Sequence, residues 1–344
     1  MDRPKKVRHA GEGPELVILI PARNEEENLK ELLPRIFVAE PHQRVYVFDD
    51  ESTDRTAKVA RDNGAIVIQP REPLPAGWTG KNRACDALAK AAIEDSNSNW
   101  MIFLDADTVT DPNFIGICRD IANSAPKNVG VVSAFPRLAP GSPFEPLFLA
   151  WVPYVLLASN PFGIVSKTGI GHNQFTNGQF TLWRKESYEQ IWPNATLRDR
   201  ILEDVQIGRL LKKSKLGLRV INLSKYLAVK MYKSPREAFD GLSKNSYEIA
   251  GNTIGSLVIS FFLLFLGFGW MFAGPRWPEV YALLCLSGLF SFMTVRMSIF
   301  NSIAMPFNLL IGAMVVLRSI LWHRSGKVQW KGRTYPAASQ SKTD

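Results

Sequence analysis

The C-terminal part of the chain contains apolar stretches that few soluble folds can accommodate. No charged residue lies between Ile249 and Pro275, and none lies between Met297 and Leu317. Each stretch reaches the roughly 20 residues that an α-helix needs to cross the ~30 Å hydrocarbon core of a bilayer. A shorter apolar stretch, Val280–Val295, lies between them. The sequence therefore predicts a membrane-spanning region at residues 249–322, with candidate spans at 252–273, 278–295 and 299–321.

The basic residues after the last candidate span predict its orientation. They are Arg318, Arg324, Lys327, Lys331 and Arg333. The positive-inside rule places such residues in the cytoplasm, so residues 323–344 are expected to form a basic cytoplasmic tail. If the N-terminal domain is also cytoplasmic, the number of crossings must be even. Three candidate spans do not satisfy this condition, and we expect the span that ends at Arg296 to be re-entrant or interfacial. The predicted location is multi-pass in the cytoplasmic membrane.

The distribution of charge separates the tail from the rest of the chain. The tail from Ile249 to Asp344 has eight Lys/Arg and two Asp/Glu, so it carries +6 of the net charge of +9. The near-neutral remainder argues against a nucleic-acid partner, which needs a basic face. The basic, apolar tail favours a bilayer with anionic lipids as a partner. Residues 1–15 are polar and basic without an apolar core, so we expect a mobile arm and no secretory signal. The three widely spaced cysteines predict reduced thiols.

From Leu16 onward, strand-like and helix-like segments alternate. The expected strands are residues 16–20, 45–48, 65–69, 100–104, 179–183 and 218–223, and the expected helices are 26–38, 54–63, 81–93 and 201–213. A further helix is expected to have Asp111 as its cap and Pro112 at its first position. This alternation predicts an α/β fold with a parallel sheet that is covered by helices on both faces. Ligands of such sheets bind at the carboxyl ends of the strands.

Acidic side chains follow two of the expected strands. Asp49 and Asp50 end the second strand, where carboxylates can hydrogen-bond a nucleobase and ribose. Asp105 and Asp107 follow the strand at 100–104. Two carboxylates at this spacing can share a hard divalent cation, and such a cation can neutralise a diphosphate. We interpret Asp54 as a helix cap.

The motifs, in chain order, resemble the family-2 inverting glycosyltransferases of the GT-A fold. The matching motifs are PARNEE at 21–26, DDESTD at 49–54, GWTGKNRA at 77–84, DAD at 105–107, NGQF at 177–180 and LED at 202–204. The resemblance covers about Leu16 to Asn245, and a membrane-spanning tail is usual for members that glycosylate lipids. Within the family, GWTGKN, GQF, ED, Met231-Tyr232, SKN at 243–245 and WKGR at 330–333 look most like the subgroup that acts on carotenoid acids and hopanoids.

This resemblance implies a catalytic domain at 16–248 that transfers one sugar from a nucleoside diphosphate sugar, expected to be UDP-linked. The residues expected to bind the donor are Pro21, Ala22, Arg23, Glu25, Asp49, Asp50, Lys81 and Asp105. A Mg²⁺ or Mn²⁺ ion would be held by Asp107 with Asp105. Asp204 would be the general base, and Gly178, Gln179 and Glu203 would line the acceptor pocket.

Several of these residues also have ordinary structural interpretations. Lys81 can be a solvated surface charge and Gly178 a turn glycine. Asp204 can be a carboxylate that a helix N-terminus stabilises. Glu203 is expected to orient the acceptor or a neighbouring Arg. His172 and Trp183 are as consistent with structural roles as with functional ones.

The expected acceptor is a membrane lipid, with polyprenoids first. Residues 143–165 are apolar and contain four prolines, so they are expected to form an interfacial or acceptor-binding segment, with a buried loop as the alternative. Residues 237–242 lack the Arg-Trp pair of processive synthases, which favours transfer of a single sugar. A glycerolipid, a polyprenyl-phosphate sugar or a polysaccharide precursor is the alternative product.

Two other functional classes remain open at this stage. A nucleotidyltransferase is disfavoured because the segment after the first strand is acidic and lacks glycine. An inactive membrane scaffold or transport protein is disfavoured because Arg296 is the only candidate for the intramembrane charge that a transport path would need, and the acidic motifs are intact.

Overall fold

The computed structural model describes residues 15–95, 97–140, 144–159, 176–325, 328–330 and 333–335. The chain forms two compact units. Unit 1 comprises Met1–Arg137 and Phe162–Val229, and unit 2 comprises Leu138–Pro161 and Lys230–Asp344. By packing, unit 1 ends at Val229, whereas the sequence suggests a domain boundary after residue 248. The helix over residues 235–250 lies in unit 2 because it packs against the C-terminal helices.

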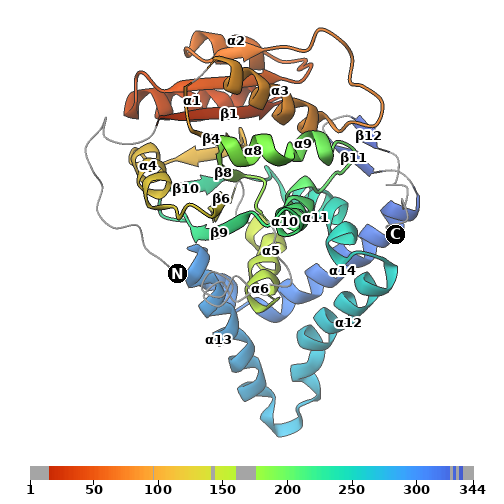
Figure 1. The fold of residues 1–344 in the computed structure, drawn as a ribbon. Coiled ribbons are helices and arrows are strands. Elements are labelled where there is room, and N and C mark those ends of the chain that lie inside the picture. The colour runs from red at the N-terminus through yellow and green to blue at the C-terminus, as the bar shows by residue number, and fades with distance from the viewer. Residues whose placement is uncertain are drawn as a thin grey trace. The chain divides into compact units, whose positions relative to one another are not determined.

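Unit 1 is built around a seven-stranded sheet with the order β3-β2-β1-β4-β8-β6-β9 (Figure 1). Its strands are β1 Leu16–Ala22, β2 Arg44–Asp49, β3 Ile66–Ile68, β4 Trp100–Leu104, β6 Val129–Phe135, β8 Phe180–Arg184 and β9 Gly217–Asn222. The sequence predicted six of these strands and missed β6, whose Gly130 and Ser133 interrupt the apolar run. Two short strands, β5 Thr108–Thr110 and β10 Leu227–Val229, pair antiparallel beside the main sheet.

The sheet is mixed rather than wholly parallel. Strand β1 pairs parallel with β2 and β4, and β6 pairs parallel with β9. Strand β8 runs antiparallel to both of its neighbours, β4 and β6. The expectation of a parallel sheet is therefore wrong at β8. The hydrophobic pattern of a short buried strand does not encode its direction, which depends on where the preceding segment enters the sheet.

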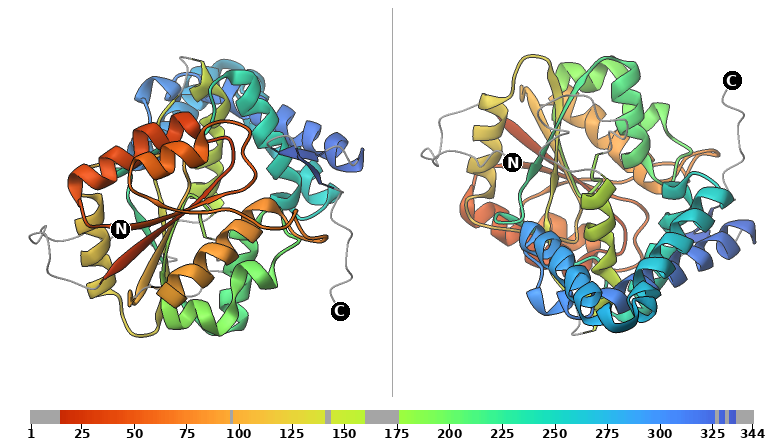
Figure 2. Two further views of the ribbon diagram at one scale, coloured as in Figure 1. Left: turned by 90° about the horizontal axis from the view of Figure 1, so that it is seen from above. Right: turned by 90° about the horizontal axis from the view of Figure 1, so that it is seen from below.

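Helices cover both faces of this sheet, as the alternation of segments predicted (Figure 2). Along β1, Ile18 and Ile20 point into one core and Val17 and Leu19 into the other. The first core is closed by α1 Glu26–Ala39, α2 Thr56–Asp62 and α4 Phe114–Ser124. The second is closed by α3 Gly80–Asp95, α8 Lys185–Ile191 and α10 Glu203–Lys213, with the short α9 Pro193–Thr196 beside α3. Trp183 is buried in the second core and stacks edge-on against Tyr188, so its role is structural.

Two predicted helix caps have different outcomes. Asp54 accepts hydrogen bonds from the N–H groups of Thr56 and Glu26, so it ties the first turns of α2 and α1 together. The N-cap position of α2 is occupied by Arg55, however, so Asp54 bonds the first helical N–H from one residue before the cap, and the expected start of the helix at Asp54 is wrong. Helix α4, however, begins at Phe114, so the expected start at Pro112 is wrong. Asp111 instead accepts the N–H of Asn113 in the turn before the helix.

Unit 2 is helical. Its helices are α5 Glu145–Leu149, α6 Trp151–Ser159, α11 Pro235–Ala250, α12 Thr253–Gly269, α13 Trp277–Val295 and α14 Met305–Arg324, with short 3₁₀ turns η1 Trp270–Phe272, η2 Gly274–Arg276 and η3 Ile299–Ser302. Strands β11 Val328–Trp330 and β12 Arg333–Tyr335 form a small antiparallel pair. In the described part of the chain, Thr253–Phe272 and Met305–Arg324 are long and apolar enough to cross a membrane. Part of the expected acceptor segment at 143–165, and His172, lie outside the described residues.

The close approach of β9 to the loop between α4 and β6 predicts an intolerant glycine. A Cβ at Gly217 would lie 2.3 Å from the carbonyl oxygen of Asn128, whereas a Cβ at Gly116 in α4 has no atom within 4 Å. We expect Gly217→Ala to lower the free energy of unfolding by ~1–3 kcal/mol. Gly116→Ala should raise it by up to ~1 kcal/mol, because alanine is the better helix former. Thermal unfolding of the two purified variants measures both effects. Equal melting temperatures would contradict the prediction.

Candidate active site

The antiparallel pairing of β4 and β8 brings two distant motifs to one edge of the sheet. Leu104, the last residue of β4, pairs with Phe180, the first residue of β8. The N–H of Asp105 then donates to the carbonyl of Gln179 at 3.1 Å. The DAD motif after β4 and the NGQF motif before β8 are therefore neighbours, although about 70 residues separate them along the chain.

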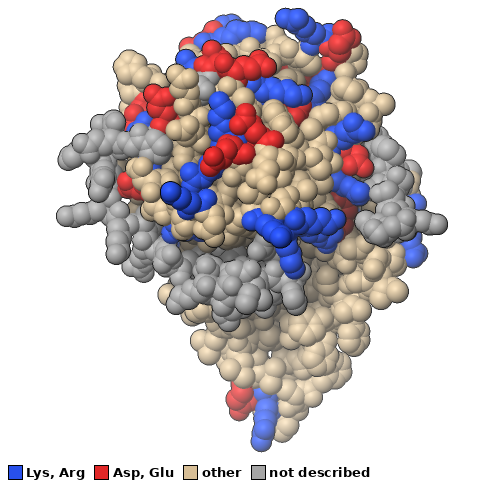
Figure 3. All heavy atoms as spheres, viewed as in Figure 1, with Lys and Arg blue, Asp and Glu red and all other residues tan. Residues whose placement is uncertain are grey.

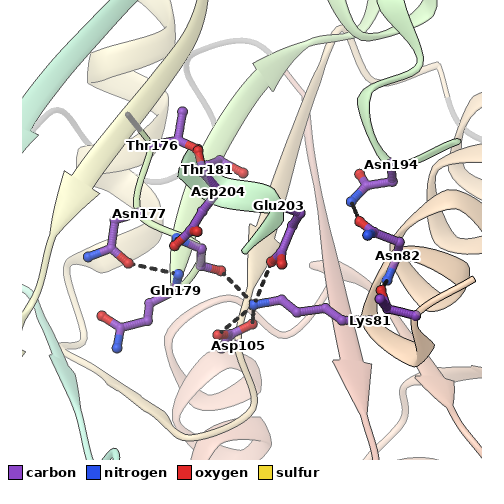
Figure 4. Close-up of polar contacts among 12 residues, drawn as sticks. Lys81, Asn82, Asp105, Thr176, Asn177, Gln179, Thr181, Asn194, Glu203 and Asp204 are labelled. Carbon is purple, nitrogen blue, oxygen red and sulfur yellow. Dashed lines mark hydrogen bonds and ion pairs between the residues drawn. The ribbon is translucent and has the colours of Figure 1, made fainter. Parts of the chain in front are cut away.

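Lys81 lies at the centre of this edge (Figure 4). Its ammonium nitrogen is 3.0 and 3.1 Å from the two carboxylate oxygens of Asp105 and 3.2 Å from Oε1 of Glu203. It also donates to the carbonyl of Gly178 at 3.3 Å. The interpretation of Lys81 as a solvated surface charge is therefore wrong, and the cation beside Glu203 is this lysine and not an arginine. Burial opposes the charge, but the Asp105 and Glu203 carboxylates raise the pKa of Lys81 well above its usual value.

Gly178 fills a position where no side chain fits easily. A Cβ there would lie 3.1 Å from Nζ of Lys81, 3.3 Å from Oδ2 of Asp204 and 3.4 Å from Oε1 of Glu203. Its N–H donates to Asp204 at 3.3 Å while its carbonyl accepts from Lys81. Gly178 therefore contacts the charged groups of Lys81 and Asp204 directly, and its lack of a side chain leaves room for them. Its role goes beyond that of an ordinary turn glycine. The backbone of Gln179 continues the contact to Asp105.

Asp204 occupies the first turn of α10, next to Glu203. Its Oδ1 accepts the N–H of Val205 at 2.8 Å and its Oδ2 accepts the N–H of Gly178. Burial raises the pKa of Asp204 and of Glu203, and the charge of Lys81 opposes this rise. A carboxylate with a raised pKa binds a proton more tightly when it is ionised. Asp204 therefore has the property that a general base near neutral pH requires.

Apart from Lys81 and Asp105, the expected donor-binding residues lie at or just after the ends of β1 and β2. Pro21 and Ala22 are the last residues of β1, and the guanidinium of Arg23 donates to the carbonyls of Asp50 and Glu51.

The two aspartates of this group are buried and held by hydrogen bonds. Asp49 accepts from the side chain of Gln69 at 2.9 Å, and Asp50 pairs with the guanidinium of Arg83. Glu25 accepts from Asn28 at 2.6 Å, within the first turn of α1. The contacts of Asp49 and Asp50 hold the end of β2 against α3 and the residue after β3, and Arg23 links it to the end of β1.

Asp107 and Asp105 offer the kind of ligand that a hard divalent cation prefers. Asp107 lies in the turn between β4 and β5. In the described ranges, no group of three or more acidic, His or Cys side chains is gathered to hold a metal. A Mg²⁺ or Mn²⁺ ion commonly takes one or two protein carboxylates and completes its shell with substrate phosphates and water. The two aspartates fit such a substrate-assisted site and do not form a complete metal cage.

Two residues beside Lys81 were missed by sequence reasoning. Asn82 is fully buried and donates to the carbonyls of Leu197 and Arg200, at 2.8 and 3.0 Å. It also accepts from Asn194 at 2.9 Å, and this contact fixes the segment that precedes Glu203. Arg83 holds Asp50. The GWTGKNRA motif contains both residues, so the signal was present, but their partners are far away in the sequence.

Comparison with known proteins agrees with this arrangement. The family described as glycosyl transferase family 2 matches residues 17–192, which is half of the chain. The protein belongs to glycosyl transferase family 2. It is therefore a glycosyltransferase, as the motifs predicted, and the nucleotidyltransferase and inactive-scaffold alternatives are set aside.

Two individual proteins are similar over most of their length. The chain is 25% identical to the 4,4'-diaponeurosporenoate glycosyltransferase of Staphylococcus aureus, over 94% of this chain and 89% of that protein. It shares 13% identity and a TM-score of 0.52 with a mannosyltransferase from Pyrobaculum calidifontis that was solved with GDP-Man and Mn²⁺, over 91% of this chain and 88% of that one. These likenesses confirm the GT-A fold and the predicted family resemblance.

The position of Lys81 predicts the pH dependence of the enzyme. Its charge lowers the pKa values of Glu203 and Asp204, which burial raises. In Lys81→Met these pKa values should rise, so the acidic limb of the kcat/KM profile should move to higher pH by ~1 unit or more. Lys30→Met, at an exposed lysine of α1, should leave the limb in place. An unchanged limb in Lys81→Met would show that neither carboxylate controls the rate.

Proposed function

We propose that this protein transfers a single sugar, with inversion, from a nucleoside diphosphate sugar to a polyprenoid lipid of the membrane. The observation that carries the proposal is the cluster of Lys81, Asp105, Glu203 and Asp204 around Gly178, because it joins the strand-end carboxylates to Asp204, the half-buried carboxylate that we assign as the base. UDP is the nucleotide that we expect. Residues 16–248 would carry catalysis, residues 249–322 would attach the protein to the membrane, and 323–344 would form the cytoplasmic tail.

The reaction that fits this cluster is a direct displacement. An oxygen of the acceptor forms a bond to the anomeric carbon, while the bond from that carbon to the diphosphate oxygen breaks. The electron pair leaves with the nucleoside diphosphate, and the proton of an acceptor hydroxyl passes to Asp204. Lys81 holds positive charge beside Asp105, at the edge where the diphosphate would lie. A divalent ion held by Asp107 and Asp105 would supply further positive charge for the leaving group when it is bound.

A polyprenoid lipid as the acceptor is supported by the Staphylococcus aureus relative and by the apolar helices of unit 2. The Staphylococcus aureus relative is named for a carotenoid acid, and the similarity continues through the C-terminal helices. Two helices of unit 2 are long and apolar enough to cross a membrane. A long polyprenoid is insoluble in water, so an enzyme that uses it must work at a bilayer. A hydroxyl or a carboxyl of such a lipid would be glycosylated.

The transfer itself can be measured directly with the whole protein in its membrane. Membranes that contain the full chain, incubated with radiolabelled UDP-sugars and a polyprenoid extract, should move label into the organic phase. EDTA should abolish this transfer, and Asp107→Ala should abolish its stimulation by Mn²⁺ or Mg²⁺ without loss of folded protein. Transfer to water-soluble acceptors alone would overturn the lipid acceptor. Near-full metal-stimulated activity in Asp107→Ala would overturn the metal assignment.

The role of Asp204 can be separated from donor binding. Asp204→Asn keeps the shape of the side chain and can still interact with Gly178, but it cannot take up a proton. With a hydroxyl acceptor, we expect kcat to fall by ~10²–10⁴-fold. The affinity for UDP, measured by calorimetry, should stay close to that of the parent. An equal loss of UDP affinity would place Asp204 in the donor site. A carboxylic acid acceptor ionises without help, so its transfer should be much less affected.

A further inference from the structure

Helices α12 and α13 of unit 2 expose apolar side chains along most of their length. On α12 these include Ile254, Leu257, Val258, Phe261, Phe262, Phe265 and Phe268, and on α13 they include Leu283, Leu286 and Met293. The side chains that α12 buries are mostly small or polar, namely Ser256, Ser260, Leu263 and Gly267. Figure 3 shows this part of unit 2 as an uncharged surface down to its tip. Such a helix has its apolar face outward, which is the reverse of a helix in water.

The connection between the two helices contains aromatic and charged residues. Trp270 lies 5.2 Å from Tyr281 and 5.9 Å from Trp277, measured between ring centroids. Arg276 and Glu279 are exposed in the same turn, and they are the charged residues between Ile249 and Val295. Trp and Tyr side chains favour the boundary between hydrocarbon and water, where one end of the ring is apolar and the other is wet. The tip therefore has the composition of a membrane interface.

The lengths of the two limbs match a bilayer. The helix from Thr253 to Phe272 has 20 residues, which at 1.5 Å per residue is ~30 Å, the thickness of a hydrocarbon core. Helix α13 has 19 residues and runs back without a break to Arg296. Each limb can thus cross completely. The second limb returns the chain to the end where Asn252 caps α12.

Helix α14 differs from these limbs, although its composition is similar. In the most apolar 18-residue stretch of α14, 56% is buried inside the protein, against 22% in the corresponding stretch that begins with α12. Gly312 packs on the ring of Trp151 in α6, and Ser319 accepts the N–H of Tyr247 in α11. Arg318 pairs with Asp240 of α11. Helix α11 carries charged residues along its length. The C-terminal half of α14, which contacts α11 through Arg318 and Ser319, therefore belongs with water-facing structure and not with acyl chains.

We propose that α12 and α13 form a hairpin that crosses the bilayer twice, with lipid acyl chains covering its outer face. The aromatic tip with Arg276 and Glu279 then reaches the opposite aqueous side. Arg296, Arg318 and the basic tail stay on the side where the chain enters the membrane. Helix α14 does not cross. This inference rests on the membrane attachment in the proposed function. It satisfies the even number of crossings that the charges require, with α13 crossing in place of α14.

Cysteine accessibility in the full chain tests this arrangement. Cys285→Ser provides the background, because Cys85 and Cys118 are buried. Single cysteines are placed at the tip (Glu279→Cys), after each limb or helix (Ser298→Cys and Ser325→Cys) and in the middle of α12 (Phe261→Cys). Right-side-out and inverted vesicles are then treated with a membrane-impermeant maleimide.

We expect the tip cysteine to react from one side only, and Cys at 298 and at 325 to react from the other side only. Phe261→Cys should react from neither side until detergent is added. Reaction of Glu279→Cys and Ser298→Cys from the same side would show that the hairpin does not cross. Reaction of Ser298→Cys and Ser325→Cys from opposite sides would show that α14 crosses. Oxidative dimerisation of Phe261→Cys as the main product would mean that a second copy covers α12, and would overturn the lipid assignment.

Alkaline carbonate extraction separates this inference from the membrane attachment on which it rests. Release of the parent protein from the membrane by carbonate would overturn the attachment itself, and the hairpin with it. Retention in the membrane, combined with same-side labelling of the tip and the base, would overturn the hairpin alone. Label transfer to lipid by the same vesicles reports the proposed activity independently of both.

Discussion

The ammonium group of Lys81 lies between carboxylates that come from separate parts of the chain, Asp105 after β4 and Glu203 at the start of α10. Three carboxylates this close, including Asp204, would repel one another, and burying them without a partner would be costly. One lysine reduces that repulsion but leaves the cluster with a net negative charge. The same lysine therefore serves both the fold of the site and its proposed chemistry.

The position of Lys81 depends in turn on the first turn of α3. Asn82 and Arg83 follow it directly and bind opposite sides of the site, the segment before Glu203 and the end of β2. Three consecutive residues thus connect the expected donor edge to the expected acceptor edge. A shift of this helix would move both edges together. Gly178 allows the approach, because a Cβ at this position would lie only 3.1 to 3.4 Å from the charged atoms of Lys81, Asp204 and Glu203.

Unit 2 distributes its apolar side chains differently from unit 1. Unit 1 buries apolar side chains on both faces of a sheet, whereas α12 buries mostly small or polar residues and both α12 and α13 expose large apolar ones. Water makes the second arrangement unfavourable, and a bilayer makes it favourable, because lipid tails are as apolar as the exposed side chains. The solvent therefore decides whether the hairpin is stable.

Local patterns in the sequence were sufficient to predict β1, β2 and β4, most of α1 and α3, and the acidic residues at the strand ends. Each of these depends on side chains within a few residues, whose spacing alone selects helix or strand. The direction of β8, the strand β6 and the start of α4 could not be read this way, because they depend on partners far along the chain. The sequence by itself also determined the family, through motifs that keep their order. Only the tertiary structure decided that Lys81 is half-buried between Asp105 and Glu203, that Gly178 lies among the charged groups, and that Asn82 holds the segment before α10. Those facts come from contacts across about 25 to 120 residues of sequence, which no local pattern of side chains encodes.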